Sequence, residues 1–376
     1  MKKILLKISL ILLVPLIIVI IINYKYDPGE IMHNRSQQMV EIGLSGKNIA
    51  IKAIPSSLHE YKIKMLELYK ASKISPDIAV WGSSRTSEFR AKFFPNYSFI
   101  NLSLPGANIK DYMALYGYCK EHNQLPKNII LGIDPWTFHT RKKLGKGNIF
   151  VADTVNKIGV GSTVKQNYIY ARQQMGLEPE LSNSLIEKPE AVAWLSNFFE
   201  FISPSYFQNC LNYLGTEFIK ATNKEELTGY SMMYNDGGYA LKNLSELDDA
   251  AVKRKSISYL NNAKGNFFCD AFAQGENMDL FYKLVETLTN KEKINLTIYI
   301  SPIHPDVYIE LMKYEKASIE LAVRKKCSEL GVKIIGGFNP EPLNLKAAGK
   351  EFSDQYHITS IGLTKILSLY NLKFIK

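Results

Sequence analysis

Five short apolar runs, separated by stretches with helical periodicity, constrain the fold of this 376-residue chain most strongly. Each run is rich in Ile, Val, Leu or Phe, and the runs cover residues 78–81, 99–102, 129–133, 296–300 and 332–335. Runs this short can also be buried helix, so their β-branched content and flanking Pro and Gly favour strands. The intervening stretches predicted as helices are 108–121, 278–289, 307–330 and 361–372. This alternation predicts an α/β fold with a parallel sheet covered on both faces.

The alternation is lost between about residues 135 and 274, where the chain is rich in Tyr, Phe and Asn. One turn is evident there, at Asn235-Asp236-Gly237-Gly238. The interval is too long for a single loop in a compact domain, so it is predicted to be an insertion with helices of its own. Residues 27–376 are therefore predicted to form one sheet domain built from two separated stretches.

The first 26 residues form a predicted membrane anchor. Residues 8–22 carry no charge, and residues 4–6, with a snorkelling Lys7, extend the apolar stretch to about the 20 residues of a transmembrane helix. Tyr24 and Tyr26 stand where interfacial aromatics anchor such a helix. The lysines at positions 2, 3 and 7 predict a cytoplasmic N-terminus and an extracytoplasmic domain. A cleaved signal peptide is the alternative, but no small-x-small site follows the apolar run.

Charge and cysteine usage narrow the expected partners. The chain has 46 Lys and Arg against 36 Asp and Glu, a net charge of +10, which suits an anionic polymer or lipid surface. Nucleic acid is not expected, because no Arg/Lys stripe with interleaved aromatics is present. The four cysteines form no C-x-x-C pair, so neither a zinc ribbon nor a redox motif is expected and disulfide pairing stays open. No metal or other cofactor is predicted. A nucleotide-binding domain is a poor alternative, because no Gly-x-Gly-x-x-Gly follows the first strand.

A turn of small residues, Gly82-Ser83-Ser84, follows the first predicted strand. Such a turn places a hydroxyl at the rim of the sheet, with backbone N–H groups near it that can bind an oxyanion. Serine is a nucleophile there only if a base can reach it. The alternative is that Ser83 and Ser84 cap the next helix.

A candidate base lies near the C-terminus, where Asp354 and His357 stand three residues apart ahead of the last predicted helix. At this spacing the carboxylate can hold one imidazole nitrogen while the other faces outward, as a serine base requires. The alternative is a helix-capping Asp beside a surface His. His304, which follows the fourth strand, is the main rival as base.

Together these positions resemble the SGNH hydrolase superfamily of GDSL-type esterases and acyltransferases. In that family a Gly-x-Ser turn, a glycine and a Gly-x-Asn-Asp segment follow the first three strands, and an Asp-x-x-His pair precedes the last helix. Ser84 matches the nucleophile, Gly106 the oxyanion glycine, and Asp354 and His357 the final pair. The resemblance covers residues 77–134 and 276–376. It implies a three-layer α/β/α, flavodoxin-like fold.

The third block departs from the family pattern. Asp134 stands where an asparagine would help to bind the oxyanion, and its carboxylate would repel developing negative charge if it pointed there. Asn101 or Asn108 is a candidate substitute. Arg85, Asp134 and Trp136 are candidates for holding a sugar, with a surface ion pair as the alternative for Arg85.

A closer likeness is to membrane-anchored members of the superfamily that acylate cell-envelope polymers, as in teichoic acid D-alanylation and alginate O-acetylation. This likeness implies a single-pass, extracytoplasmic enzyme for acyl transfer or ester hydrolysis on a cell-surface glycan or envelope polymer. It also implies a multi-spanning membrane acyltransferase as partner. The alternative, which Asp134 favours, is a catalytically silent domain that binds polymer or scaffolds that acyltransferase.

Overall fold

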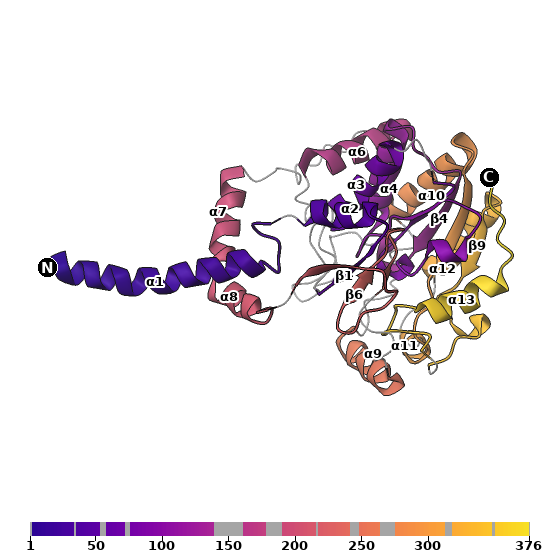
Figure 1. Cartoon of the computed structure of the whole chain (residues 1–376). Helices are drawn as coiled ribbons and strands as arrows, with labels where there is room; N and C mark the ends of the chain where they lie inside the picture. The colour runs from indigo at the N-terminus through magenta and orange to yellow at the C-terminus, as the bar shows by residue number, and fades with distance from the viewer. Residues whose placement is uncertain are drawn as a thin grey trace.

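The folded body contains two sheets and their covering helices (Figure 1). The computed structural model describes residues 2–33, 35–52, 58–71, 76–138, 161–177, 190–215, 217–240, 248–263, 275–312, 318–347 and 350–375. The larger sheet has five strands, β2 (Ile78–Trp81), β3 (Phe99–Asn101), β4 (Asn128–Ile133), β8 (Asn295–Ile300) and β9 (Lys333–Gly336). All of its pairings are parallel, in the order β3-β2-β4-β8-β9. The predicted mixed α/β class with a parallel sheet is confirmed.

Both faces of the parallel sheet are buried, which explains why its strands are almost continuously apolar. Along β2, Ala79 and Trp81 belong to one apolar cluster, whereas Ile78 and Val80 belong to the other. The first cluster includes side chains of α4 (Ile109–Glu121), α10 (Glu276–Glu286) and α12 (Ser318–Glu329). The second includes side chains of α13 (Ser360–Leu369). The predicted helix over 307–330 begins as a separate short helix, α11 (Pro305–Leu311).

The smaller sheet is antiparallel and was not predicted. Its order is β5 (Ile219–Thr222), β1 (Asn48–Ile51), β6 (Ser231–Met233) and β7 (Tyr239–Ala240). Three of these strands come from the insertion, whereas β1 precedes the parallel sheet in the chain. The insertion therefore joins the N-terminal stretch in one sheet. It also carries α6 (Gly161–Gln174), α7 (Glu190–Phe201), α8 (Pro204–Leu211) and α9 (Asp249–Ala263).

The remaining helices lie in the N-terminal part of the chain: α1 (Lys2–Tyr26), α2 (Ser36–Leu44) and α3 (Leu58–Ala71). In Figure 1, α1 projects from the body, while its C-terminal end lies beside α8. Among the residues that the structure describes, no helix is long and apolar enough to cross a membrane. The membrane anchor expected within residues 1–26 stays a prediction.

Candidate active site

Ser84, His357 and Asp354 meet at the carboxyl edge of the parallel sheet. Ser84 Oγ lies 2.8 Å from Nε2 of His357, and Nδ1 of the same ring lies 2.7 Å from Oδ2 of Asp354. Ser84 is the first residue of a single 3₁₀ turn, η1 (Ser84–Thr86), and lies three residues after β2. Asp354 and His357 precede α13. Both distances are normal for hydrogen bonds, and the order of groups is that of a Ser-His-Asp triad. The structure thus brings together the three residues predicted to be catalytic.

The backbone around Asp354 fixes its carboxylate. Oδ1 accepts hydrogen bonds from the N–H groups of Tyr356, at 2.9 Å, and His357, at 2.8 Å. Burial alone would raise the pKa of Asp354, but the interactions with His357 and these N–H donors bring the pKa below its ordinary value. An ionised Asp354 accepts a hydrogen bond from Nδ1–H, and this fixes the tautomer in which Nε2 of His357 is free to take the serine proton.

Two glycines make room for the turn that carries Ser84. Thr86 Oγ1 donates to the carbonyl of Ser83 at 2.9 Å and lies 2.6 Å from Ser103 Oγ. A Cβ at Gly82 or at Gly132 would collide with the Thr86 side chain. Ser83 itself caps η1, because its Oγ accepts the N–H of Arg85 at 3.1 Å. The capping alternative therefore holds for Ser83, whereas the Ser84 hydroxyl faces the imidazole.

Arg85 is buried and forms its ion pair inside the protein rather than at the surface. Its burial disfavours the predicted contact with substrate. Its Nη2 donates to the carbonyls of Ser301, at 2.6 Å, and Pro302, at 2.7 Å, and its Nε donates to that of Tyr356 at 3.0 Å. Its Nη1 lies 3.0 Å from Oδ1 of Asp134. A guanidinium has five N–H donors, which suits a position where several carbonyls converge. Arg85 ties the nucleophile turn to the ends of β4 and β8 and to the His357 segment.

Asp134 is also buried, with 2% of its side chain exposed, which disfavours its predicted contact with substrate. Burial raises the pKa of Asp134, and the Arg85 guanidinium opposes that shift. The carboxylate that stands at the family's asparagine position is therefore paired with an internal cation. It no longer counts as an uncompensated charge beside the oxyanion.

The side-chain amide of Asn101, a predicted oxyanion donor, is already engaged by backbone carbonyls. This amide is buried and donates to the carbonyls of Thr86, at 2.9 Å, and Phe89, at 3.0 Å, and it contacts that of Ser87 at 3.3 Å. The alternative candidate, Asn108, caps α4 with its Oδ1, which accepts the N–H of Lys110 at 2.8 Å. The Asn101 amide thus holds the backbone just after Ser84, and the Asn108 side chain holds the start of α4.

The backbone N–H groups of Ser84 and Gly106 are the remaining candidates for oxyanion donors. Within the described residues, neither N–H donates to a protein acceptor. Gly106 is exposed, with a φ of +71° that favours glycine, in the loop after β3. This loop is joined to the nucleophile turn because Leu104 N donates to the carbonyl of Gly82 at 2.8 Å.

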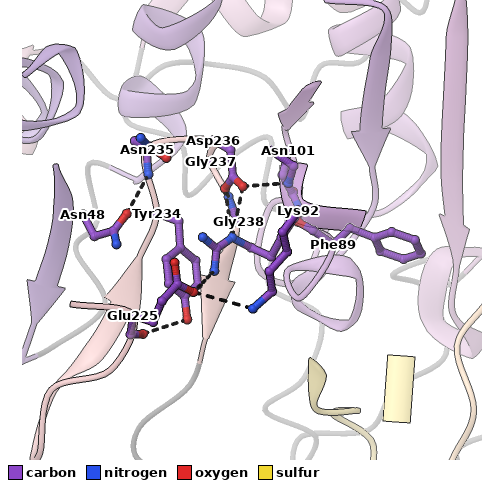
Figure 2. Close-up of polar contacts among 12 residues, drawn as sticks. Asn48, Phe89, Lys92, Asn101, Glu225, Tyr234, Asn235, Asp236, Gly237 and Gly238 are labelled. Carbon is purple, nitrogen blue, oxygen red and sulfur yellow. Dashed lines mark hydrogen bonds and ion pairs between the residues drawn. The ribbon is translucent and has the colours of Figure 1, made fainter. Parts of the chain in front are cut away.

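A hairpin of the insertion packs against the nucleophile loop, residues 82–98 between β2 and β3. The sequence indicated the Asp-Gly-Gly turn of this hairpin but not its contact with the loop. Figure 2 shows Asp236 and Gly237 of the β6–β7 turn beside Asn101 of β3. The Asp236 carboxylate accepts hydrogen bonds from Arg90 Nε, at 3.1 Å, and Ala91 N, at 2.8 Å. Asn101 N donates to the carbonyl of Asp236 at 2.8 Å. The backbone after Ser84 is thus held from two sides.

The buried Lys62 completes this brace. Its Nζ donates to the carbonyls of Asn101, at 2.6 Å, and Gly237. Burial lowers the pKa of Lys62 to about 7, although the nearby Asp236 acts in the opposite direction. The ammonium sits between β3 and the hairpin turn, so it links the parallel sheet to the insertion.

We expect Glu88→Gln to change how stability depends on pH. Glu88 is buried in the nucleophile loop, and burial raises its pKa from 4.5 to about 8, against the opposing charges of Arg90 and Lys92. The folded state therefore keeps a proton that the unfolded chain releases above pH 4.5. The free energy of unfolding should fall as the pH rises from 5 to 7, by up to about 1.4 kcal/mol per pH unit.

Urea unfolding at pH 5, 6 and 7 measures this slope, because Lys62 keeps its proton in both states over most of that range. Glu88→Gln should flatten it, whereas the exposed Glu341→Gln should leave it as in the wild type. A slope that Glu88→Gln leaves unchanged would contradict a protonated Glu88 in the folded state.

Two further residues singled out from the sequence, His304 and Trp136, both lie close to the triad segment or to its packing partners. His304 is fully buried, its ring lies edge-on to Phe352 at 5.3 Å, and burial lowers its pKa. The imidazole that meets Ser84 is that of His357, so the rival base is not needed. Trp136 is half-buried, with the Arg85 guanidinium 5.4 Å from its ring and the Tyr356 ring 5.7 Å away. It lies next to the triad segment, and its contact with a sugar stays a prediction.

In the described part of the chain, no group of three or more His, Cys, Asp or Glu side chains is arranged to hold a metal ion. Cys119, Cys210 and Cys327 are buried free thiols, and Cys269 lies outside the described residues. Burial raises the pKa of Cys119 to about 12, so this thiol is a poor nucleophile at neutral pH. No family model and no curated protein matches this chain.

Proposed function

We propose that this protein is an SGNH-type serine acyltransferase or esterase that acts on a cell-surface glycan or envelope polymer. The observation that carries the proposal is the Ser84–His357–Asp354 relay, with successive distances of 2.8 and 2.7 Å. The placement of these groups supports the SGNH resemblance. Ser84 follows the first strand of the parallel sheet, Gly106 follows the next strand in the chain, and the Asp-His pair precedes the last helix. Helices on both faces of that sheet fit the three-layer, flavodoxin-like form of the fold.

In the proposed mechanism, Ser84 Oγ attacks the carbonyl carbon of an acyl ester while Nε2 of His357 takes its proton. Asp354 holds the imidazole in the required tautomer and stabilises the imidazolium. The N–H groups of Ser84 and Gly106 bind the tetrahedral oxyanion. His357 then returns the proton to the departing alkoxide, leaving an acyl-Ser84. Water or an acceptor hydroxyl, deprotonated by His357, attacks this ester and releases Ser84.

The competing proposal is a catalytically silent domain that binds polymer or scaffolds a membrane acyltransferase. Its main support was the carboxylate of Asp134 at the oxyanion position. Because Asp134 is buried and paired with Arg85 at 3.0 Å, that support is lost. The intact relay favours an enzyme instead.

The proposed location and partner rest on the resemblance to membrane-anchored members of the superfamily. A multi-spanning membrane acyltransferase remains the proposed partner, and the outer side of a membrane, with attachment through residues 1–26, remains the proposed location. The net charge of +10 suits an anionic envelope polymer as acceptor. A membrane acyltransferase would supply the acyl group, and the triad would transfer it to the acceptor hydroxyl.

A fluorophosphonate probe tests the proposed nucleophile directly. The purified full-length chain should form a covalent adduct, and peptide mass spectrometry should locate that adduct at Ser84, because the His357 base activates this hydroxyl. Ser84→Ala should abolish labelling, whereas the exposed Ser368→Ala should label as the wild type does. A folded wild-type protein that fails to label would favour the silent domain.

A further inference from the structure

One stretch of α1 has apolar side chains exposed on every side. Residues 13–18 are six consecutive exposed positions, and six residues cover more than one and a half helical turns. The exposed fractions of Leu13, Val14 and Ile18 lie between 49% and 52%. A protein partner that packs against one face would leave the other side chains in water. A helix that is apolar all round is typical of a surrounding apolar medium.

A second apolar surface lies on α7. Trp194 is 59% exposed, Leu195 46% and Phe199 64%, and Phe198 stacks on Trp194 with ring centroids 5.4 Å apart. At 100° per residue, these positions share one face of the helix. Trp and Phe with Leu on one exposed helical face are typical of helices that lie in the headgroup region of a bilayer.

The two surfaces are adjacent because α7 and α8 pack on the end of α1. Phe201 of α7 belongs to one apolar cluster with Tyr206 of α8 and with Ile20 and Tyr26 of α1. The Tyr206 hydroxyl also accepts the N–H of Gly29 at 3.0 Å. Figure 1 shows α7 lying across the C-terminal end of α1, while the N-terminal part of α1 projects away from the body. Lipid around the exposed part of α1 would thus meet the apolar face of α7 at its surface.

We propose that α7 is an interfacial helix, with Trp194, Leu195 and Phe199 inserted among the headgroups and upper acyl chains of a lipid bilayer. The all-round exposure of residues 13–18 favours lipid over a protein partner that packs on one face, because lipid covers every side of a helix. Tyr24, 55% exposed at the same end of α1, is a further interfacial aromatic. The proposal does not depend on the triad or on the reaction that it performs.

Trp194 provides a probe that reports on α7 alone. The chain has three tryptophans, of which Trp81 is fully buried and Trp136 is half-buried beside the triad. The full-length protein would be reconstituted into phosphatidylcholine vesicles brominated near the top of the acyl chains. The lipid is zwitterionic because α7 carries Glu190 and Glu200 and no basic residue. Emission should be quenched relative to unbrominated vesicles, and Trp194→Phe should remove most of that quenching.

A double variant that keeps the fluorophore separates lipid contact from general exposure. Leu195→Ser with Phe199→Ser should weaken the quenching of Trp194, whereas Leu321→Ser, at an exposed leucine of α12, should not. Circular dichroism would establish that each variant is folded. Quenching that is the same in the wild type and in Trp194→Phe would overturn the proposal. So would a dimer in detergent that the double variant dissociates, because the face would then belong to a second copy of the chain.

Discussion

Replacing Ser84 with Ala is expected to lower the turnover of an acyl ester by roughly 10⁴- to 10⁶-fold, provided that the triad acts as proposed. The substitution removes the only atom that bonds to the acyl carbon. It leaves intact the Ser83 cap and the hydrogen bond of Arg85 to Tyr356. We therefore expect a folded protein with the wild-type unfolding midpoint. The measurement is the rate of hydrolysis of p-nitrophenyl acetate by the purified chain.

The two partners of Ser84 should show how tightly the triad is coupled. His357→Ala should cost about as much as Ser84→Ala, and the double variant should cost no more than either, because residues that act as a unit are not additive. Asp354→Asn keeps Oδ1, which accepts two backbone N–H groups, but replaces the acceptor for Nδ1–H. It should cost about 10⁴-fold. Losses that multiply in the double variant, or turnover that Ser84→Ala leaves unchanged, would remove Ser84 from the mechanism.

The parallel sheet could be predicted because its strands carry a strong local signal. Strands buried on both faces are runs of apolar residues, and all five predicted runs match observed strands to within one residue at each end. The triad could be predicted for a related reason. Carboxyl ends of parallel strands meet at one edge of the sheet, so polar motifs that follow these strands come together without further information.

The smaller sheet lacked such a signal. β1 has four residues and pairs with β5 and β6, about 170 to 185 positions away along the chain. Strands this short, with no alternation of apolar and polar residues, do not indicate which distant segment of the chain they pair with. The brace of the nucleophile loop by Asp236 depends on this pairing, so it was missed together with the sheet.

Arg85 and Asn101 show that the sequence does not predict the direction in which a side chain points. Each was correctly expected at the carboxyl edge of the sheet, but its side chain points into the protein rather than toward substrate. What decides the direction is the set of carbonyls that converges on each side chain. For Arg85 these belong to Ser301, Pro302 and Tyr356, more than 200 residues away in the chain. Residue type alone does not distinguish a polar group that awaits a ligand from one that satisfies buried backbone.

Arg85→Met is expected to lower the free energy of unfolding by about 3–5 kcal/mol, the cost of removing one partner of a buried ion pair. The change leaves Asp134 without its cation and three buried carbonyls without a donor. Because Arg85 opposes the effect of burial, its removal should raise the pKa of Asp134 further. A raised pKa in the folded state means that stability is lost as the pH rises above the pKa of the unfolded chain, near 3.9. The deficit of Arg85→Met should therefore grow as the pH rises above that value.

A double-mutant cycle with Asp134→Asn separates the two consequences of losing Arg85. Urea unfolding followed by circular dichroism should show that Arg85→Met with Asp134→Asn is more stable than Arg85→Met at pH 7. The double variant should also lose the extra dependence on pH. Part of the deficit should persist, because the carbonyls of Ser301, Pro302 and Tyr356 still lack a donor. Arg254→Met, at an exposed arginine of α9, is the matched control and should stay within about 0.5 kcal/mol of the wild type. A double variant no more stable than Arg85→Met would show that the charge of Asp134 is balanced by a group other than Arg85.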